Sequence, residues 1–255
     1  MNLIIAANWK MHKTRAETAD FCRALLGDLD YFEGVEVLIC PPFTALSAAA
    51  DHIGGSALKL GAQNMHWEQE GAFTGEIAGP MLMELGVEYV IIGHSERRHI
   101  MGEDNRQIRL KLEAALENGL KPILCVGETE AQREEGSTTG VIKDQLIAAL
   151  EGLPPEKTGS LVVAYEPVWA IGTGKAARPE DADEACSLIR DVIGEILGSG
   201  PAEKVPIQYG GSVKEANIGS FVKLASIQGA LVGGASLEAD SFSALIRAAR
   251  KAVQS

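Results

Sequence analysis

Basic residues are scarce relative to acidic ones in this chain of 255 residues. Lysine and arginine together number 23 and aspartate and glutamate 35, so the formal net charge is −12 at pH 7. A protein that binds the phosphate backbone of a nucleic acid needs lysine and arginine to displace counterions, so this balance argues against a nucleic-acid partner. It does not exclude a small anionic ligand, because a local electric field can oppose the overall charge.

Long apolar runs and paired cysteines are also absent. No segment approaches the run of about 18 apolar residues that a membrane-spanning helix requires, so we expect no membrane association. The apolar run at residues 3–7 is too short for the core of a signal peptide. The cysteines form no Cys-x-x-Cys pair, which argues against a zinc ribbon or a redox pair. We therefore expect buried, reduced thiols in a cytoplasmic protein. The four cysteines are Cys22, Cys40, Cys125 and Cys186.

Linkers and a dinucleotide-binding motif are missing as well. The chain has no low-complexity tract and no stretch rich in proline and serine, so we expect residues 1–255 to form a single domain. No Gly-x-Gly-x-x-Gly motif follows the first apolar run, where a dinucleotide-binding sheet would place it. The apolar fraction of 46% is that of an ordinary globular protein.

Eight short runs rich in β-branched residues recur along the chain. Each run is nearly all apolar rather than alternating, which is typical of parallel strands that are covered on both faces. The expected strands are residues 3–7, 35–40, 57–61, 89–92, 122–126, 161–164, 205–209 and 229–232.

Helical patterns follow these runs. Residues 14–17 and residues 212–215 are predicted capping boxes, and Pro179 is placed to open a helix. Eight strands that alternate with helices predict an α/β fold, namely a closed, eight-stranded parallel (β/α)8 barrel. An open, doubly wound sheet is the alternative.

Chemistry in such a barrel lies at the C-terminal ends of the strands. Glu166 leaves a buried strand directly into a loop, where partial burial raises the proton affinity of a carboxylate and makes it a usable base. His94 also ends a strand, and Ser95 is a candidate helix cap. The helix dipole would then disfavour a positive ring, so that a neutral His94 can polarise a carbonyl oxygen. A solvent-facing glutamate and a histidine that only caps its turn are the alternatives.

Lys10 provides a cation at the end of the first strand. Glu96 is placed to pair with Lys10, and Asn8 can contribute an amide donor to the same site. The alternative is an ordinary solvated lysine. The other histidines show no ligand spacing with His94, so we expect no metal site.

Glycines separate strand from helix after the last two strands, at residues 210–212 and 233–236. Backbone N–H groups without side-chain cover at the start of a helix make an anion site. Barrels frequently bind phosphate with these two loops. Either loop alone is equally well explained as a tight turn, but the two together favour phosphate. An acidic chain can hold an anion in this way because the donors are dipoles rather than net charge.

The loop that follows Glu166 combines an apolar tip with two glycines, which predicts a lid that closes over the site and expels water. An ordinary surface loop is the alternative, although permanent exposure of its tryptophan and isoleucine would be unusual. The predicted lid residues are Pro167, Trp169, Ile171, Gly172, Thr173, Gly174 and Lys175.

Seven segments that span essentially the whole chain resemble the triosephosphate isomerase family. They are ANWKM (7–11), GAQN (61–64), GAFTGE (71–76), GHSERR (93–98), AYEPVWAIGTGK (164–175), YGGS (209–212) and LVGGAS (231–236). The resemblance implies a TIM barrel and an isomerase of glycolysis and gluconeogenesis. Such an enzyme interconverts dihydroxyacetone phosphate and D-glyceraldehyde 3-phosphate through an enediol(ate).

The resemblance also implies a role for each site residue. Glu166 would move the carbon-bound proton. A neutral His94 would polarise the carbonyl and shuttle protons between the oxygens. Lys10 would stabilise negative charge, with Asn8 hydrogen-bonding nearby and Glu96 orienting Lys10. The phosphate would be bound by backbone N–H groups of Gly172, Ser212, Gly233 and Gly234. No metal or organic cofactor is implied.

A homodimer is the last implication of the resemblance. Residues 65–79 match the family's long loop, which enters the neighbouring subunit near Asn8 and Lys10. Thr74 would reach toward the other site, and Glu76 would pair with Arg97. A flexible polar loop is the alternative, although a loop of this length in a compact domain usually has a function.

Two rival functions remain. The first is another phosphate-binding barrel enzyme, such as an aldolase of the Schiff-base type, which would need a desolvated lysine on a barrel strand. The lysines considered, Lys10, Lys121 and Lys175, lie at loop or strand ends. The second is a catalytically silent barrel that only binds phosphate or a partner protein. The presence of both Glu166 and His94 argues against silence.

Overall fold

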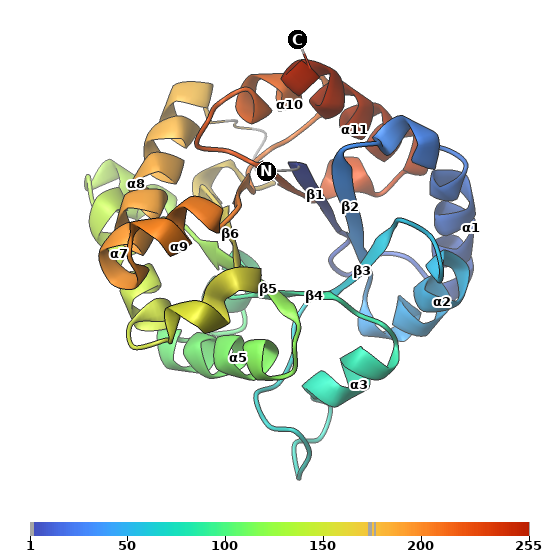
Figure 1. The fold of residues 1–255 in the computed structure, drawn as a ribbon, viewed down its shortest axis with the longest axis horizontal. Coiled ribbons are helices and arrows are strands. Elements are labelled where there is room, and N and C mark those ends of the chain that lie inside the picture. The colour runs from blue at the N-terminus through green and yellow to red at the C-terminus, as the bar shows by residue number, and fades with distance from the viewer. Residues whose placement is uncertain (1–2, 173–174, 176, 255) are drawn as a thin grey trace.

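Eight parallel strands close into a barrel in this computed structural model, which describes residues 3–172, 175 and 177–254. Each strand pairs with its neighbours in chain order, and β8 pairs with β1 (Figure 1). The strands are β1 (Leu3–Asn8), β2 (Val35–Cys40), β3 (Lys59–Ala62), β4 (Tyr89–Ile92), β5 (Lys121–Val126), β6 (Val162–Tyr165), β7 (Ile207–Tyr209) and β8 (Gly229–Val232). The predicted barrel is confirmed, and the doubly wound alternative is wrong.

Helices follow the strands and surround the barrel (Figure 1). The α-helices are α1 (Arg15–Leu26), α2 (Phe43–Ile53), α3 (Gly79–Glu84), α4 (Ser95–His99), α5 (Asn105–Glu117), α6 (Glu130–Glu134), α7 (Thr138–Leu150), α8 (Pro179–Leu197), α9 (Ser199–Lys204), α10 (Glu215–Val222) and α11 (Ala239–Gln254). Short 3-10 helices are η1 (Leu29–Phe32), η2 (Pro155–Ser160), η3 (Val168–Ala170) and η4 (Gly234–Ser236). Within the described part of the chain, no helix is long and apolar enough to span a bilayer.

Of the three helix starts predicted from a capping box or from proline, two are correct and one is wrong. Thr14 and Glu17 form the predicted capping box of α1, and Pro179 opens α8. The third helix, α10, is capped at Lys214 rather than at Ser212. The Asn217 side chain accepts a hydrogen bond from the Lys214 N–H at 2.7 Å and donates one to the Ser212 carbonyl at 3.0 Å. Because asparagine reaches back to the chain here, Ser212 lies in the loop before the helix.

The strands separate two apolar layers. Alternate residues of β1 belong to different layers: Ile4 and Ala6 to the smaller cluster, and Ile5 and Ala7 to the larger one that includes the helices. The smaller cluster is therefore the barrel interior, because side chains of a strand alternate between its faces. The same alternation places Asn8, the last residue of β1, on the inner face at the mouth of the barrel.

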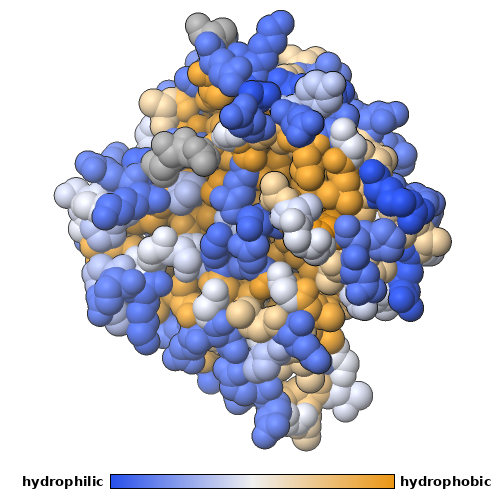
Figure 2. All heavy atoms as spheres, turned by 45° about the vertical axis from the view of Figure 1, so that its right-hand side comes forward, coloured by the Kyte–Doolittle hydropathy of each residue, from blue (hydrophilic) through white to orange (hydrophobic). Residues whose placement is uncertain are grey.

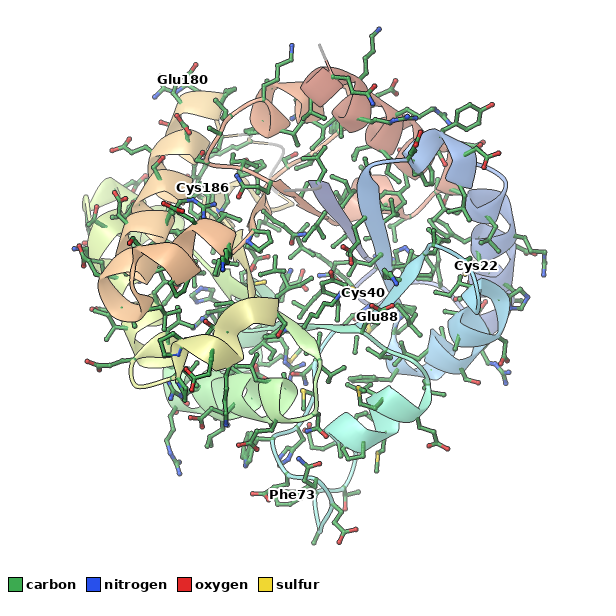
Figure 3. The ribbon with its side chains drawn as sticks, in the orientation of Figure 1. Cys22, Cys40, Phe73, Glu88, Glu180 and Cys186 are labelled. Carbon is green, nitrogen blue, oxygen red and sulfur yellow. The ribbon has the colours of Figure 1, made fainter. Side chains whose placement is uncertain are left out.

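A loop between β3 and α3 projects beyond the barrel (Figure 1). Phe73 lies on this projection, away from the ring of strands (Figure 3), and its side chain is exposed. Figure 2 shows that apolar atoms also reach the surface elsewhere on the side that carries α1 and α2. The loop is thus anchored to the barrel at its ends, and Phe73 near its tip is only partly covered by its own chain, where its ring packs 4.4 Å from that of His66.

All four cysteines are buried free thiols, as the sequence predicted. Cys40 lies in the barrel interior, whereas Cys22 and Cys186 lie in the layer between strands and helices (Figure 3). Burial raises the pKa of the Cys22 thiol to about 11 and also raises the pKa values of the other three thiols.

The native protein is therefore expected to resist alkylation. With a pKa of about 11, Cys22 is a thiolate in roughly one molecule in a thousand at pH 8, and the thiolate is the reactive form. Treatment with iodoacetamide at pH 8 should modify no cysteine in the native protein and all four in urea, as counted by mass spectrometry. Rapid modification of the native protein would show that a thiol is accessible and contradict this packing.

Candidate active site

One cavity of about 780 Å³ collects residues from the C-terminal ends of several strands. Its lining includes every residue predicted to react with or bind the substrate except Glu96, which pairs with Lys10. The predicted residues in the lining are Asn8, Lys10, His94, Glu166, Gly172, Ser212, Gly233 and Gly234. Residues that are far apart in the sequence therefore meet at the rim that the barrel rule selected.

Lys10 is held in an unusual backbone conformation with a φ of +53°. Its N–H donates to Asn8 Oδ1 at 3.0 Å, and its carbonyl accepts a hydrogen bond from Gln63 Nε2 at 2.8 Å. A left-handed conformation is costly for a residue with a side chain and persists where neighbours fix it. Because Asn8 uses its oxygen here, its amide NH₂ is the group that it can offer a ligand.

The Lys10 ammonium is paired with the carboxylate that the sequence placed beside it. Its Nζ lies 2.5 Å from Glu96 Oε1. Both side chains remain partly exposed, so the pair orients the lysine at the cavity wall without burying its charge. A cation in this position can attract an anionic ligand to a chain whose overall charge is negative.

His94 is the N-cap of α4, and Ser95 is the first residue of that helix. The predicted Ser95 cap is thus one residue out of place. His94 Nδ1 accepts a hydrogen bond from the Glu96 N–H at 3.2 Å. Since Nδ1 is the acceptor, the ring proton is assigned to Nε2, the nitrogen that points toward Glu166.

Glu166 is almost fully buried, with 2% of its surface exposed. One carboxylate oxygen, Oε1, lies 2.9 Å from His94 Nε2, and the other, Oε2, accepts a hydrogen bond from the Ser95 N–H at 2.7 Å. The solvent-facing alternative for Glu166 is therefore wrong. Both oxygens of the carboxylate are occupied by groups at the start of α4.

Two glycines make room for Glu166. A Cβ atom at Gly127 would lie 1.8 Å from the Glu166 carbonyl oxygen, and one at Gly210 would lie 3.0 Å from Glu166 Cγ. Any larger residue at Gly127 would collide with the backbone. Close approach of the chain after β5 and β7 thus accommodates this glutamate at the end of β6.

Contact between Glu166 and His94 alters the pKa of both groups. Burial raises the pKa of the Glu166 carboxyl, but the His94 imidazole and the Ser95 N–H outweigh burial, so the pKa lies below its ordinary value. Burial lowers the pKa of His94, but the carboxylates of Glu166 and Glu96 raise it above its ordinary value. The sequence predicted the opposite direction for each group, because it did not show that the two side chains touch.

The two glycine loops lie on the side of the cavity that carries Lys10. A Cβ atom at Gly233 would lie 3.5 Å from Lys10 Cε, which places the loop after β8 directly beside the lysine. The helix that follows Gly233 is the 3-10 turn η4 rather than an α-helix. Ser212 lines the same cavity from the loop after β7. Backbone dipoles and one ammonium group are thereby close enough to act on one anion.

The predicted lid is partly described by the structure. Trp169 Nε1 donates to Oε1 of the fully buried Glu128 at 2.9 Å, and the Arg133 guanidinium lies 4.4 Å from the centre of the Trp169 ring. Ile171 and Gly172 line the cavity. Lys175, at the far end of the loop, pairs with Glu130. The predicted lid residues Thr173 and Gly174 lie outside the described residues.

The sequence did not single out several residues that shape this site. Gln63, Gly127 and Glu128 act through contacts with residues far along the chain. Gly210 was predicted as part of a phosphate loop, but its close approach to Glu166 was not. Gly127 follows the end of β5, so the rule that selected the other strand ends would also have selected it. In the described ranges, no three His, Cys, Asp or Glu side chains are grouped to hold a metal ion.

Comparison with known proteins gives a consistent result. The family model described as "Triosephosphate isomerase" matches residues 3–249. The chain belongs to the triosephosphate isomerase family. It is 51% identical to the triosephosphate isomerase of Carboxydothermus hydrogenoformans over 95% of this chain and 97% of that protein. It is 50% identical to that of Symbiobacterium thermophilum over 98% of this chain and 97% of the relative.

The fold is also that of the triosephosphate isomerase family. The crystal structure of triosephosphate isomerase from Bartonella henselae superposes with a TM-score of 0.88 at 37% identity, covering 98% of this chain and 100% of that one. Membership in the triosephosphate isomerase family makes the chain an isomerase with a TIM barrel and sets aside the two rival functions.

Proposed function

We propose that this cavity interconverts dihydroxyacetone phosphate and D-glyceraldehyde 3-phosphate, with Glu166 as the base. The observation that supports this assignment best is the contact between the Glu166 carboxylate and His94 Nε2 at 2.9 Å. A carboxylate of lowered pKa is ionised at neutral pH, and the imidazole beside it can reach the same small substrate.

The proposed reaction consists of four proton transfers, two on carbon by Glu166 and two on oxygen by His94. Glu166 takes a proton from the carbon next to the substrate carbonyl, and the electron pair left on that carbon forms the carbon–carbon double bond of an enediolate. His94 donates its Nε2 proton to the carbonyl oxygen and recovers a proton from the neighbouring hydroxyl. Glu166 then returns its proton to the former carbonyl carbon, so no atom or electron is gained or lost.

Before this reaction, the Glu166 carboxylate must leave Ser95 and His94 to reach a substrate carbon. Its departure removes the main influence that raises the pKa of His94. Burial, the Glu96 N–H on Nδ1 and the Lys10 cation remain and disfavour a charged ring, and together they oppose the Glu96 carboxylate, which favours one. His94 is thus neutral when it faces the substrate carbonyl, which is the state that the proposed transfer requires.

Groups on the opposite wall of the cavity stabilise the negative charge of the substrate. Lys10 faces the developing oxyanion and the phosphate, Asn8 adds its amide donor, and Glu96 orients the lysine. Backbone N–H groups of Gly172, Ser212, Gly233 and Gly234 bind the phosphate. Closure of the lid excludes water. Proton transfer with electrostatic stabilisation needs no metal or organic cofactor.

A direct assay tests this function. Purified protein should convert D-glyceraldehyde 3-phosphate to dihydroxyacetone phosphate, and inorganic phosphate should compete with the substrate. Absence of turnover would exclude the proposal, because every residue that it invokes is present in the chain.

We also propose that residues 1–255 act as a single domain in a cytoplasmic homodimer. Arg97 binds Glu103 within the chain, Nε to Oε1 at 2.5 Å, whereas Glu76 makes no ion pair in the described part of its own chain. Thr74 is exposed near the tip of the projecting loop. Glu76 and Thr74 are thus available to meet a second copy. Large apolar side chains of the same segments are exposed as well: Met11, Phe73, Met81, Met83, Ile100 and Met101.

Sedimentation tests the assembly. The protein should sediment at twice the chain mass down to nanomolar concentration, since burial of these apolar side chains favours association. Phe73→Glu should yield monomers at the same concentration. Ile147→Glu, a matched change of an exposed apolar residue on α7, should leave the dimer intact. A wild-type monomer with full activity would contradict the proposed dimer.

A further inference from the structure

The backbone ladder between β4 and β5 stops before it reaches the proposed catalytic histidine. Ile92 and Leu124 are the last paired residues of these strands, and His94 lies two residues beyond. By contrast, Val126 of β5 still pairs with Tyr165 of β6, and the Glu166 N–H donates to the Val126 carbonyl at 2.7 Å. Glu166 is thus fixed to β5 by backbone bonds. Among the backbone bonds of the described residues, none joins His94 to β5.

Arg98 supplies the missing connection with its side chain. Its Nη2 donates to the Cys125 carbonyl at 3.0 Å, and its Nε donates to the Gly93 carbonyl at 2.8 Å. One guanidinium group therefore bridges the ends of β4 and β5 where the ladder has stopped.

The same residue holds both peptide groups that flank His94. The Gly93 carbonyl, which precedes His94, accepts from the Arg98 side chain, and the carbonyl of His94 itself accepts from the Arg98 N–H at 3.1 Å. Two fixed peptide groups determine the direction in which the Cα–Cβ bond between them points. The position of the imidazole thus depends on Arg98.

The Arg98 guanidinium, whose three nitrogen atoms form a fork, has little freedom to move. Its third arm, Nη1, donates to Asn105 Oδ1 at 2.8 Å, at the first residue of α5. Gly93 has a φ of +70°, and a Cβ atom there would lie 3.0 Å from Arg98 Nη2. A planar guanidinium can bind three acceptors in fixed directions, which a lysine ammonium on its flexible stem does not reproduce.

We propose that Arg98 is a positioning residue that fixes His94 relative to Glu166 by joining the ends of β4 and β5. The inference rests on the proposed roles of His94 and Glu166. Without the fork, the end of β4 keeps only the turns of α4 and the contacts of Ser95 and His94 with the Glu166 carboxylate, which break when Glu166 moves to the substrate. The imidazole then moves relative to the backbone of Glu166, which stays bound to β5. Arg98 touches neither substrate nor reacting atoms in this account.

Two substitutions of Arg98 separate its effect on the position of His94 from the effect of its charge. Arg98→Lys keeps the cation and Arg98→Met removes it, but neither can bridge three acceptors. Because a displacement of about 1 Å can cost roughly 100-fold in rate, we expect kcat to fall by about 10- to 100-fold in both variants. KM and inhibition by inorganic phosphate should change by less than about 3-fold, since the phosphate loops follow β7 and β8 on another part of the rim.

Arg109 provides the matched control. It lies on α5, and its Nη1 donates to the carbonyls of Ala149 and Glu151 at 2.9 and 2.8 Å, outside the cavity. Arg109→Met should lower Tm but leave kcat within about 2-fold of wild type. The His94 ring gives a readout independent of turnover: its ¹⁵N NMR signals should shift in Arg98→Met and not in Arg109→Met.

Several results would overturn the inference. Wild-type kcat in Arg98→Lys would assign the effect to charge, and an equal loss of kcat in Arg109→Met would assign it to general destabilisation. Unchanged His94 signals in Arg98→Met would exclude a change of position. If Arg98→Met does not fold, Asn105→Ala removes only one anchor of the fork and should shift the same signals. An inactive wild-type protein would defeat the proposed function, whereas the NMR comparison would still decide the role of Arg98.

Discussion

Glu166→Gln is expected to fold and to lose nearly all isomerase activity. Glutamine keeps the shape of the side chain but cannot accept a proton. We therefore expect kcat to fall by about 10²- to 10⁴-fold, which is the contribution of a positioned general base. Binding of a phosphorylated enediolate mimic should persist, because Lys10 and the glycine loops remain. Steady-state kinetics and calorimetric titration with the mimic measure the two effects separately.

Glu117→Gln is the control for this substitution. Glu117 is an exposed residue at the end of α5, and its replacement should leave kcat unchanged. Circular dichroism should give similar spectra for both variants, although the amide at position 166 leaves one of its buried contacts with Ser95 or His94 unsatisfied. Near wild-type turnover in Glu166→Gln would remove this residue from the role of base.

Lys10→Met is expected to weaken both binding and turnover. The ammonium lies beside the glycine loop after β8, so the substrate dianion loses its nearest cation. Interactions of this kind are worth about 1.5–3 kcal/mol, so the dissociation constant of the enediolate mimic should rise by roughly 10- to 150-fold. The fall in kcat/KM should be larger, because charge on the enediolate oxygen is also left unpaired.

Lys13→Met serves as the control for Lys10→Met. Lys13 lies three residues away and also has a positive φ, but its ammonium packs 5.5 Å from the centre of the Trp9 ring instead of lining the cavity. Its replacement should leave binding of the mimic unchanged. A Lys10→Met protein with normal binding and slower turnover would contradict electrostatic binding of the substrate dianion by Lys10.

Much of the fold could be predicted because each strand carries its own signal. Uninterrupted β-branched runs separated by helical patterns placed every strand within two residues of its observed bounds. Helix starts were harder where two polar residues compete for one cap. At α4 the imidazole of His94 rather than Ser95 accepts the first N–H, and at α10 Asn217 moves the start away from Ser212. Local spacing does not decide such competitions.

The candidate site could be predicted in composition but not in geometry. The rule about strand ends selected Lys10, His94 and Glu166 and the glycine loops, because position along a strand is visible in a sequence. Direct contact between His94 and Glu166 is not visible, and that contact reverses the expected pKa shifts of both groups. The bridging role of Arg98 depends on carbonyls of two strands, so only the folded arrangement reveals it.

Proton transfer through Glu166 is the central claim, and isomerisation in ²H₂O tests it most directly. A carboxylate that holds the substrate proton exchanges it with solvent before returning a hydrogen to carbon. Conversion of dihydroxyacetone phosphate by the wild-type protein should therefore place deuterium on the carbon next to the carbonyl of the product, as read by ¹H NMR. Isomerisation that leaves both product and recovered substrate free of carbon-bound deuterium would indicate direct hydride transfer and contradict the account.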